Sequence, residues 1–145
     1  MKILFRIIFV ASCSASVMFA HGNEGAKSGV GPNQGILEAD EHDGFVLRSN
    51  AEQNFAIQKF PLKTGTPWTI PARALIYSGL EIQVFRQREG HWKTADVDVI
   101  RKAGTMVEVR SKDLIAGDQI AVEGTGFLKI IEQSVFGPAA AGHDH

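Results

Sequence analysis

Histidine and carboxylate side chains near the two ends of the chain are the residues whose chemistry is easiest to name, because together they suit a metal ion. They form three short groups: His21 with Glu24, the run Asp40-Glu41-His42-Asp43, and His143-Asp144-His145. Imidazoles and carboxylates are ligands of divalent transition metals. The candidate metal ligands are therefore His143, Asp144, His145, His21 and His42. A structural zinc site needs four ligands at fixed spacing, so solvated polar ends are the alternative explanation of the same residues.

No group of side chains in the sequence has the spacing of a recognised catalytic site. Ser78 and Ser111 have no histidine in a known arrangement with them. Asp96 and Asp98 lie two residues apart, so on a strand they would share a face and pair their carboxylates for acid–base chemistry. A solvated face explains them more simply. We expect no enzyme activity and no cofactor beyond the divalent metal considered above.

The charge of the chain excludes one class of partner. Lysine and arginine number 15 against 16 acidic residues, for a formal net charge of −1. The basic residues form no cluster and no stripe interleaved with aromatics, so nucleic acid is not an expected partner. With 44% hydrophobic and 21% charged residues, the composition is that of one globular domain with extra termini.

The first 20 residues have the composition of a secretory signal peptide. Lys2 and Arg6 provide a positive start, and an uncharged run of 14 residues extends from Ile7 to Ala20. This run is shorter than the roughly 20 apolar residues that a membrane-spanning helix needs. We therefore expect export with cleavage after Ala20. The run that ends at Cys13 resembles a bacterial lipobox, and lipidation of that cysteine is the alternative.

The rest of the chain divides by composition into a tether, a domain and a tail. Residues 21–44 are rich in glycine and acidic side chains, and they bury too little apolar surface to offset the entropy of ordering. We predict that they form a flexible tether. Residues 45–136 carry the apolar runs and form a single domain. Residues 137–145 form a second flexible segment, which ends in the His-Asp-His group.

Apolar and polar residues alternate through much of the domain, which is typical of half-buried strands. The alternating stretches are 55–60, 82–85, 96–99 and 107–110. Glycine turns that favour hairpins lie at 77–80, 88–91 and 102–105. These features predict an all-β fold, a small antiparallel β-barrel or roll with one or two short helical turns.

Three local patterns add detail to this fold. Ser49 and Glu52 have the spacing of a capping box, which predicts a helical turn in which each side chain bonds a backbone group of the other's residue. Replacing Ser49 by alanine would then cost about 1 kcal/mol. A second helical turn is predicted over 111–116, ended by Gly117. Prolines on both sides of 68–70 place that segment at the edge of a sheet.

Several short motifs in the second half of the domain occur in the order found in one known family. They are Thr69-Ile70-Pro71-Ala72-Arg73-Ala74-Leu75, Gly79, Val84-Phe85, Val107-Glu108-Val109, Gly117-Asp118-Gln119-Ile120-Ala121-Val122 and Gly124. This series resembles the membrane-proximal part of periplasmic adaptor subunits, also called membrane-fusion proteins, of RND-type heavy-metal efflux pumps.

The first half of the domain is similar to the leader of the same adaptors. The matching segments are Gly31-Pro32-Asn33-Gln34-Gly35-Ile36-Leu37-Glu38, Gly44-Phe45, Leu47-Arg48-Ser49 and Phe55-Ala56-Ile57. Together the two resemblances cover nearly all of residues 31–136. A full adaptor inserts a lipoyl-like domain, a β-barrel domain and often a helical hairpin between these parts, whereas here residues 60–66 join them directly. The chain therefore looks like the membrane-proximal domain on its own.

The resemblance implies a non-catalytic protein of the periplasm that docks to efflux pump or adaptor subunits. Peripheral association with the membrane and self-association are also compatible with it. A second hypothesis is a soluble periplasmic protein whose His/Asp/Glu-rich ends capture metal ions and deliver them to such a system. A third is a structural remnant with neither activity, because glycine and valine motifs also serve only to specify a β fold.

Overall fold

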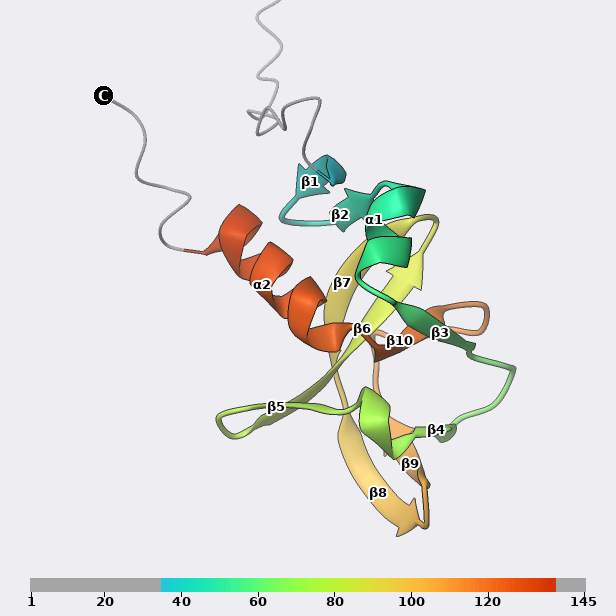
Figure 1. Ribbon diagram of the computed structural model, residues 1–145. Helices are drawn as coiled ribbons and strands as arrows, with labels where there is room; N and C mark the ends of the chain where they lie inside the picture. Colours follow the sequence, from blue (N-terminus) through green and yellow to red (C-terminus); the bar gives the residue numbers. More distant parts are fainter. Residues whose placement is uncertain (1–34, 138–145) are drawn as a thin grey trace, which may run out of the picture.

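The computed structural model describes residues 35–137, which form two antiparallel sheets and two α-helices (Figure 1). In spatial order, the path of the first sheet is β1 (Ile36–Asp40), β2 (Gly44–Leu47), β7 (His91–Asp96), β6 (Glu81–Arg88), β10 (Gln119–Glu123) and β3 (Gln58–Pro61), with β5 (Ile76–Ser78) also paired to β6. The second sheet is β4 (Trp68–Pro71), β9 (Met106–Arg110) and β8 (Asp98–Ala103). The helices are α1 (Ser49–Asn54) and α2 (Thr125–Phe136), with a 3₁₀ turn at Ala72–Ala74.

The first sheet is buried on both faces, so neighbouring residues of one strand belong to different cores. In β6, Val84 packs with the second sheet whereas Phe85 packs with α2, and both side chains are fully buried. In β10, Ile120 and Ala121 divide in the same way. Successive side chains of a strand point to opposite faces, and the apolar residues at successive positions therefore build a layer on each side of the sheet.

Local sequence patterns predicted the hairpins and the edge strand correctly. The glycine turns lie between β5 and β6, between β6 and β7, and between β8 and β9, and each of these pairs is antiparallel. Segment 68–70 lies in β4, which pairs with β9 and forms an edge of its sheet. The mostly β, antiparallel class of the fold is therefore confirmed.

Of the two predicted forms, barrel or roll, the barrel is not found, because the two sheets do not close on one another. The stretch 96–99, predicted as one strand, is divided between β7 and β8, and β8 belongs to the other sheet. Val97 lies at this junction, buried, with its N–H donating to the Ile82 carbonyl at 2.9 Å. The chain thus changes sheets at Val97, and the edges of the first sheet are β1 and β3.

The predicted tether extends too far into the chain. Strand β1 and the turn to β2 fall within residues 21–44, and β1 pairs with β2 through Ile36 and Leu47 among other residues. The Arg48 N–H also donates to the Gly35 carbonyl at 2.8 Å. The folded part therefore begins by residue 35, because strand pairing supplies the interactions that local composition lacks.

Of the two predicted helical turns, the first is present as α1 but lacks its predicted cap, and the second is absent. Helix α1 starts at Ser49, but Arg48 is its N-cap and no side chain caps the helix, so the capping box is wrong. Residues 111–116 form bends and a turn without helix. Gly117 does adopt a positive φ, of 95°, which a glycine reaches without steric cost.

Helix α2 was not predicted, although its apolar residues recur at helical spacing. Leu128 and Ile131 are buried three residues apart and join the core on the first sheet. Gly124 separates β10 from this helix with φ of 76°, and a Cβ there would lie 2.8 Å from Ile57 Cγ1. The glycine thus permits both the change of direction and the close approach of the chain to Ile57.

Candidate functional site

Only one of the predicted metal ligands lies in the described part of the chain. His21, His143, Asp144 and His145 lie outside residues 35–137, so their role stays a prediction. His42 lies in the turn between β1 and β2, where its side chain is 94% exposed and its Nδ1 is 3.0 Å from Asp43 Oδ1. Within residues 35–137, no three histidine, cysteine or acidic side chains are placed to hold one metal ion.

The carboxylate of Asp40 shapes the turn that carries His42. Its Oδ1 accepts hydrogen bonds from the backbone N–H groups of His42 at 2.7 Å and Asp43 at 3.0 Å. These two bonds, first that from Asp43, lower the pKa of Asp40 from its ordinary value because they stabilise the charged form. Asp40 therefore helps to fold the turn, as an aspartate commonly does at such a position.

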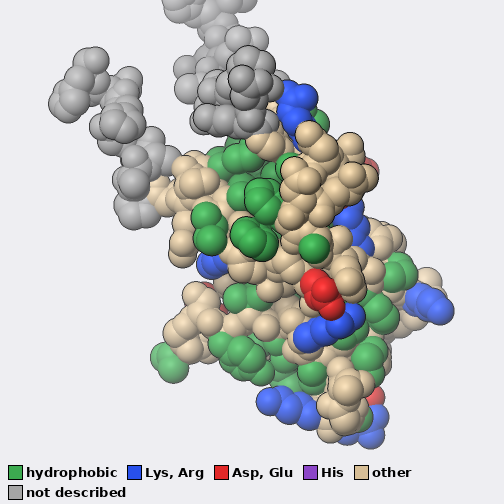
Figure 2. Space-filling view, viewed as in Figure 1, with side chains coloured by type: hydrophobic (Ala, Val, Ile, Leu, Met, Phe, Trp, Pro, Cys, Tyr) green, Lys and Arg blue, Asp and Glu red, His purple; other side chains and the backbone are tan. Residues whose placement is uncertain are grey.

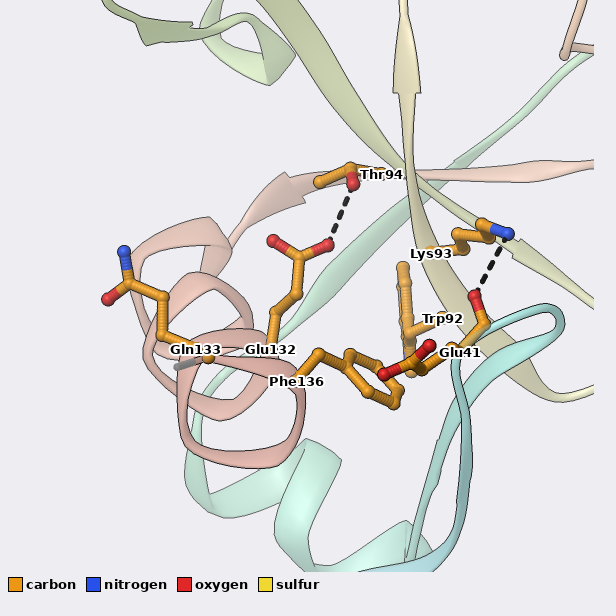
Figure 3. A pocket seen from close by; sticks show the side chains of 9 residues that line it. Glu41, Trp92, Lys93, Thr94, Glu132, Gln133 and Phe136 are labelled. Carbon is orange, nitrogen blue, oxygen red and sulfur yellow. Dashed lines mark hydrogen bonds between the residues drawn. The ribbon is translucent and has the colours of Figure 1, made fainter. Parts of the chain in front are cut away.

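An open cavity of about 450 Å³ lies between this turn, β7 and the end of α2 (Figure 3). Glu41 lines it from the turn, and Glu132, Gln133 and Phe136 line it from α2. Trp92 in β7 also lines it and is fully buried, so this ring closes the cavity toward the core. The size is within the range of small-ligand sites.

The charged groups of this cavity differ in how they are paired. Glu132 accepts from Thr94 Oγ1 at 2.7 Å and from Lys129 Nζ at 2.8 Å. Lys93 donates to the backbone carbonyls of Glu41 and His42. The Glu41 carboxylate accepts no hydrogen bond from any side chain or backbone group in residues 35–137. It points from the turn toward α2 (Figure 3).

Glu52 of α1 is the centre of a partly buried polar network. Its Oε1 accepts from Trp92 Nε1 at 2.7 Å and Gln87 Nε2 at 2.8 Å, and its Oε2 accepts from Lys59 Nζ at 2.6 Å. Lys59 also donates to Gln87 Oε1 at 2.7 Å and lies 5.3 Å from the centroid of the Trp92 ring. Each side chain that donates to the Glu52 carboxylate belongs to a strand of the first sheet, so this carboxylate ties α1 to that sheet.

Asp118 is fully buried and anchors the loop before β10. Arg88 binds it with two hydrogen bonds, Nε to Oδ1 at 2.8 Å and Nη2 to Oδ2 at 2.9 Å, and the Ile115 N–H donates to Oδ2 at 3.0 Å. The same Arg88 Nη2 donates to the Asp113 carbonyl at 2.9 Å. The hydrogen bond to Asp118 raises the pKa of Arg88, because it stabilises the charged guanidinium group. These contacts hold the loop in place and leave no free group for chemistry.

The outer face of α2 exposes large apolar side chains. Phe127 is 49% exposed and Ile130 is 63% exposed. The Phe127 ring stacks on Phe55, with ring centroids 4.9 Å apart. Figure 2 shows hydrophobic side chains gathered over this helix. A solvent-facing helix surface is ordinarily polar, and a patch of this kind often marks a site of interaction.

The residues considered for catalysis do not form a reactive arrangement. Among the described residues, neither Ser78 nor Ser111 is hydrogen-bonded to a histidine, and Ser111 Oγ instead accepts from the Asp113 N–H at 3.1 Å. Asp96 and Asp98 are exposed residues of different strands, because β7 ends at Asp96 and β8 begins at Asp98. The predicted shared strand face is therefore wrong, and the Asp96 carboxylate accepts from Gln83 at 2.8 Å.

Comparison with known proteins returned no relative. No family model, no curated protein and no solved structure matches the chain. Among residues 35–137, no helix has the length and apolar character needed to cross a membrane.

Local sequence patterns did not predict the roles of Glu52 and Asp118, the residues that organise this part of the structure. Glu52 was noted, but for a local bond that it does not make, and Asp118 was noted only as part of a motif. The spacing of the apolar residues from Phe127 to Val135 is the one signal that would have predicted α2. The cavity carries no sequence signal, because Glu41, Trp92 and Glu132 come from three separate parts of the chain.

Proposed function

We propose that this chain is a non-catalytic periplasmic protein, similar to the membrane-proximal domain of an adaptor, that docks to the pump or adaptor subunits of an RND-type heavy-metal efflux system. The proposal rests on the resemblance of two sequence segments to that family. It also accounts for an exposed apolar helix in a domain whose polar groups mostly serve the fold.

The observation that carries the proposal is that strands from the first half of the domain pair directly with strands from the second half. Strand β2, from the first segment, pairs with β7 through Phe45 and Trp92. Strand β3 pairs with β10 through Phe60 and Ile120. In full adaptors other domains lie between the two segments in sequence, so direct pairing supports a self-contained domain of this type.

The surface best suited to docking is the outer face of α2 around Phe127 and Ile130. Burying half-exposed apolar side chains is favourable by roughly 25 cal/mol per Å² of apolar surface removed from water. A stable interface covers about 800 Å² on each partner. Phe127 and Ile130 would form the central part of such an area. Hot spots at the centre of an interface carry most of the binding energy.

The variant F127S/I130S is expected to lose its partner. Removing two central apolar contacts costs more than about 1 kcal/mol each, so recovery of a pump or adaptor subunit by an epitope-tagged full chain from cross-linked cells should fall at least tenfold. Leu80→Ser is the matched control, because Leu80 is fully exposed on the distant β5–β6 hairpin. Circular dichroism of both variants checks that the fold is retained.

Recovery of an inner-membrane pump or full-length adaptor by the natural chain is the result that supports docking. A chain recovered alone, in cells with or without metal stress, would overturn the proposal. Equal recovery of the partner subunit by F127S/I130S and Leu80→Ser would show that docking does not need the outer face of α2. It would refute this surface as the docking site.

A specific observation favours the second candidate function, metal capture by the ends of the chain. Gly137 lines the same cavity as Glu41, which is next to His42. His143 follows Gly137 by six residues, and an extended chain of that length spans about 20 Å. The C-terminal His-Asp-His group is therefore within reach of the turn that carries His42.

Deleting residues 142–145 is expected to weaken zinc binding at least tenfold in calorimetric titration, because it removes two imidazoles and a carboxylate. His91→Ala is the matched control, because His91 is the one histidine of the chain that is not a predicted ligand. An unchanged titration of the shortened chain would refute metal capture by this tail.

A further inference from the structure

The cavity between the β1–β2 turn, β7 and α2 has a chemical character that neither candidate function uses. It is bounded by the Glu41 and Glu132 carboxylates, by the Phe136 side chain and by the buried Trp92 (Figure 3). Its volume of about 450 Å³ is larger than one long amino-acid side chain needs. The question is which ligand this combination of groups recognises.

Acidic groups outnumber basic groups around the cavity. Glu41 and Glu132 both line it, and Asp40 and Asp43 lie within two residues of Glu41. Lys93 also lines it, but its ammonium group is directed away from α2 onto the carbonyls of Glu41 and His42 (Figure 3). The other nearby cation is Lys129, which pairs with Glu132 at 2.8 Å. This excess of carboxylates favours a cation as the ligand.

The carboxylates also have hydrogen-bonding capacity left for such a ligand. A carboxylate offers about four lone-pair sites. Glu132 has one described donor on each oxygen, Thr94 and Lys129, whereas Glu41 has no described donor on its carboxylate. A cation with several N–H groups would add bonds at both carboxylates without displacing Thr94 or Lys129.

The apolar side of the cavity suits the carbon stem of that cation. Phe136 is partly exposed at the rim and Trp92 closes the inner end. Lysine and arginine bury their methylene stems along apolar surface while the charged group reaches polar partners. An aromatic ring also attracts a cation that lies over its face.

We propose that this cavity receives the basic side chain of a partner protein, with the ammonium or guanidinium group between Glu41 and Glu132 and the stem against Phe136. The site concerns the chain itself and does not depend on which protein complex the chain joins. It is also separate from the outer face of α2, because Phe127 contacts Phe55, just after α1, whereas Glu132 and Phe136 face β7 and the turn.

The test uses two small probes of nearly the same shape, N-acetyl-lysine methylamide and its uncharged analogue N-acetyl-norleucine methylamide. Each is titrated into the isotope-labelled chain at low ionic strength while the amide resonances of Gly44, Thr94 and Gln133 are followed by NMR. We expect saturable shifts at these three residues with the lysine probe and at least fivefold weaker binding of the norleucine probe. The shifts should shrink at high salt, because screening weakens exposed ion pairs.

Two variants locate the effect at Glu41. Glu41→Gln is expected to weaken the lysine probe up to about fivefold, the upper range for one exposed ion pair. Glu41→Lys places a cation in the cavity and should abolish binding. Glu81→Lys is the matched control on the distant β5–β6 hairpin and should bind as the natural chain does.

Each remaining outcome would overturn the proposal. These outcomes are equal affinity for the two probes, shifts confined to other acidic parts of the surface, and unchanged binding by Glu41→Lys. None of them depends on an efflux pump, so failure here would leave the docking proposal standing, and failure of docking would leave this site standing.

Discussion

Replacing Asp118 by asparagine is expected to lower the free energy of unfolding by about 3 kcal/mol, one of the two largest effects expected for a polar substitution in this domain. The variant keeps the shape of the side chain but removes the charge that two Arg88 hydrogen bonds use. Arg88 is 32% exposed, so water compensates part of the loss and the cost lies at the lower end for a broken buried pair. Urea denaturation measures the difference.

The matched control for this prediction is Asp113→Asn in the same loop. Arg88 contacts Asp113 through the backbone carbonyl, and the Asp113 side chain is exposed. Its substitution should therefore change stability by less than about 0.5 kcal/mol. Equal losses for the two asparagine variants would contradict the assignment of Asp118 as the anchor of the loop.

The second large effect is expected for Glu52→Ala, which should also destabilise the fold by about 3 kcal/mol. The substitution leaves Trp92 Nε1 and Gln87 Nε2 without their acceptor, and it removes the charge beside Lys59. An unpaired donor in a fully buried tryptophan pays the cost of lost hydration. Urea denaturation followed by tryptophan fluorescence reports both the stability and the surroundings of Trp92.

Ser49→Ala on the same helix is the control that separates the network from local capping. Ser49 Oγ makes no capping bond, so this variant should lose less than about 0.3 kcal/mol. A capping box would instead make Ser49→Ala cost about 1 kcal/mol. Comparable losses for Ser49→Ala and Glu52→Ala would therefore refute the network and restore the local prediction.

Glu52 and the glycine hairpins illustrate why some predictions were confirmed and others were wrong. A hairpin is decided by residues that are close in the chain, since a glycine turn and the alternation beside it specify the pairing. The hairpins at 77–80, 88–91 and 102–105 were predicted for that reason. The capping-box pattern predicts Ser49 as the partner of Glu52. In the structure its carboxylate instead binds Trp92, Gln87 and Lys59 from other elements.

Strand pairing between distant segments accounts for the errors at larger scale. The composition of residues 36–44 predicts a tether, yet β1 and β2 are ordered because β2 adds to the edge of β7. Alternation across 96–99 predicts one strand, yet the chain changes sheets at Val97. In both cases the structure is stabilised by contacts between strands that are far apart in the chain, and a local sequence pattern does not include both strands.

The same distinction between local and long-range contacts applies to the fold as a whole and to the candidate sites. The sequence by itself determined the antiparallel β class, the positions of the hairpins, the edge strand β4 and the identity of the histidine-bearing segments, because these depend on composition and on near neighbours. Only the tertiary structure decided that the sheets stay open, that α2 covers one face with Phe127 and Ile130 outward, and that Glu41 and Glu132 meet across one cavity. Glu41 and Glu132, for example, are about 90 residues apart in the chain. Packing of the first sheet brings such distant side chains together, and local sequence patterns do not predict contacts of that kind.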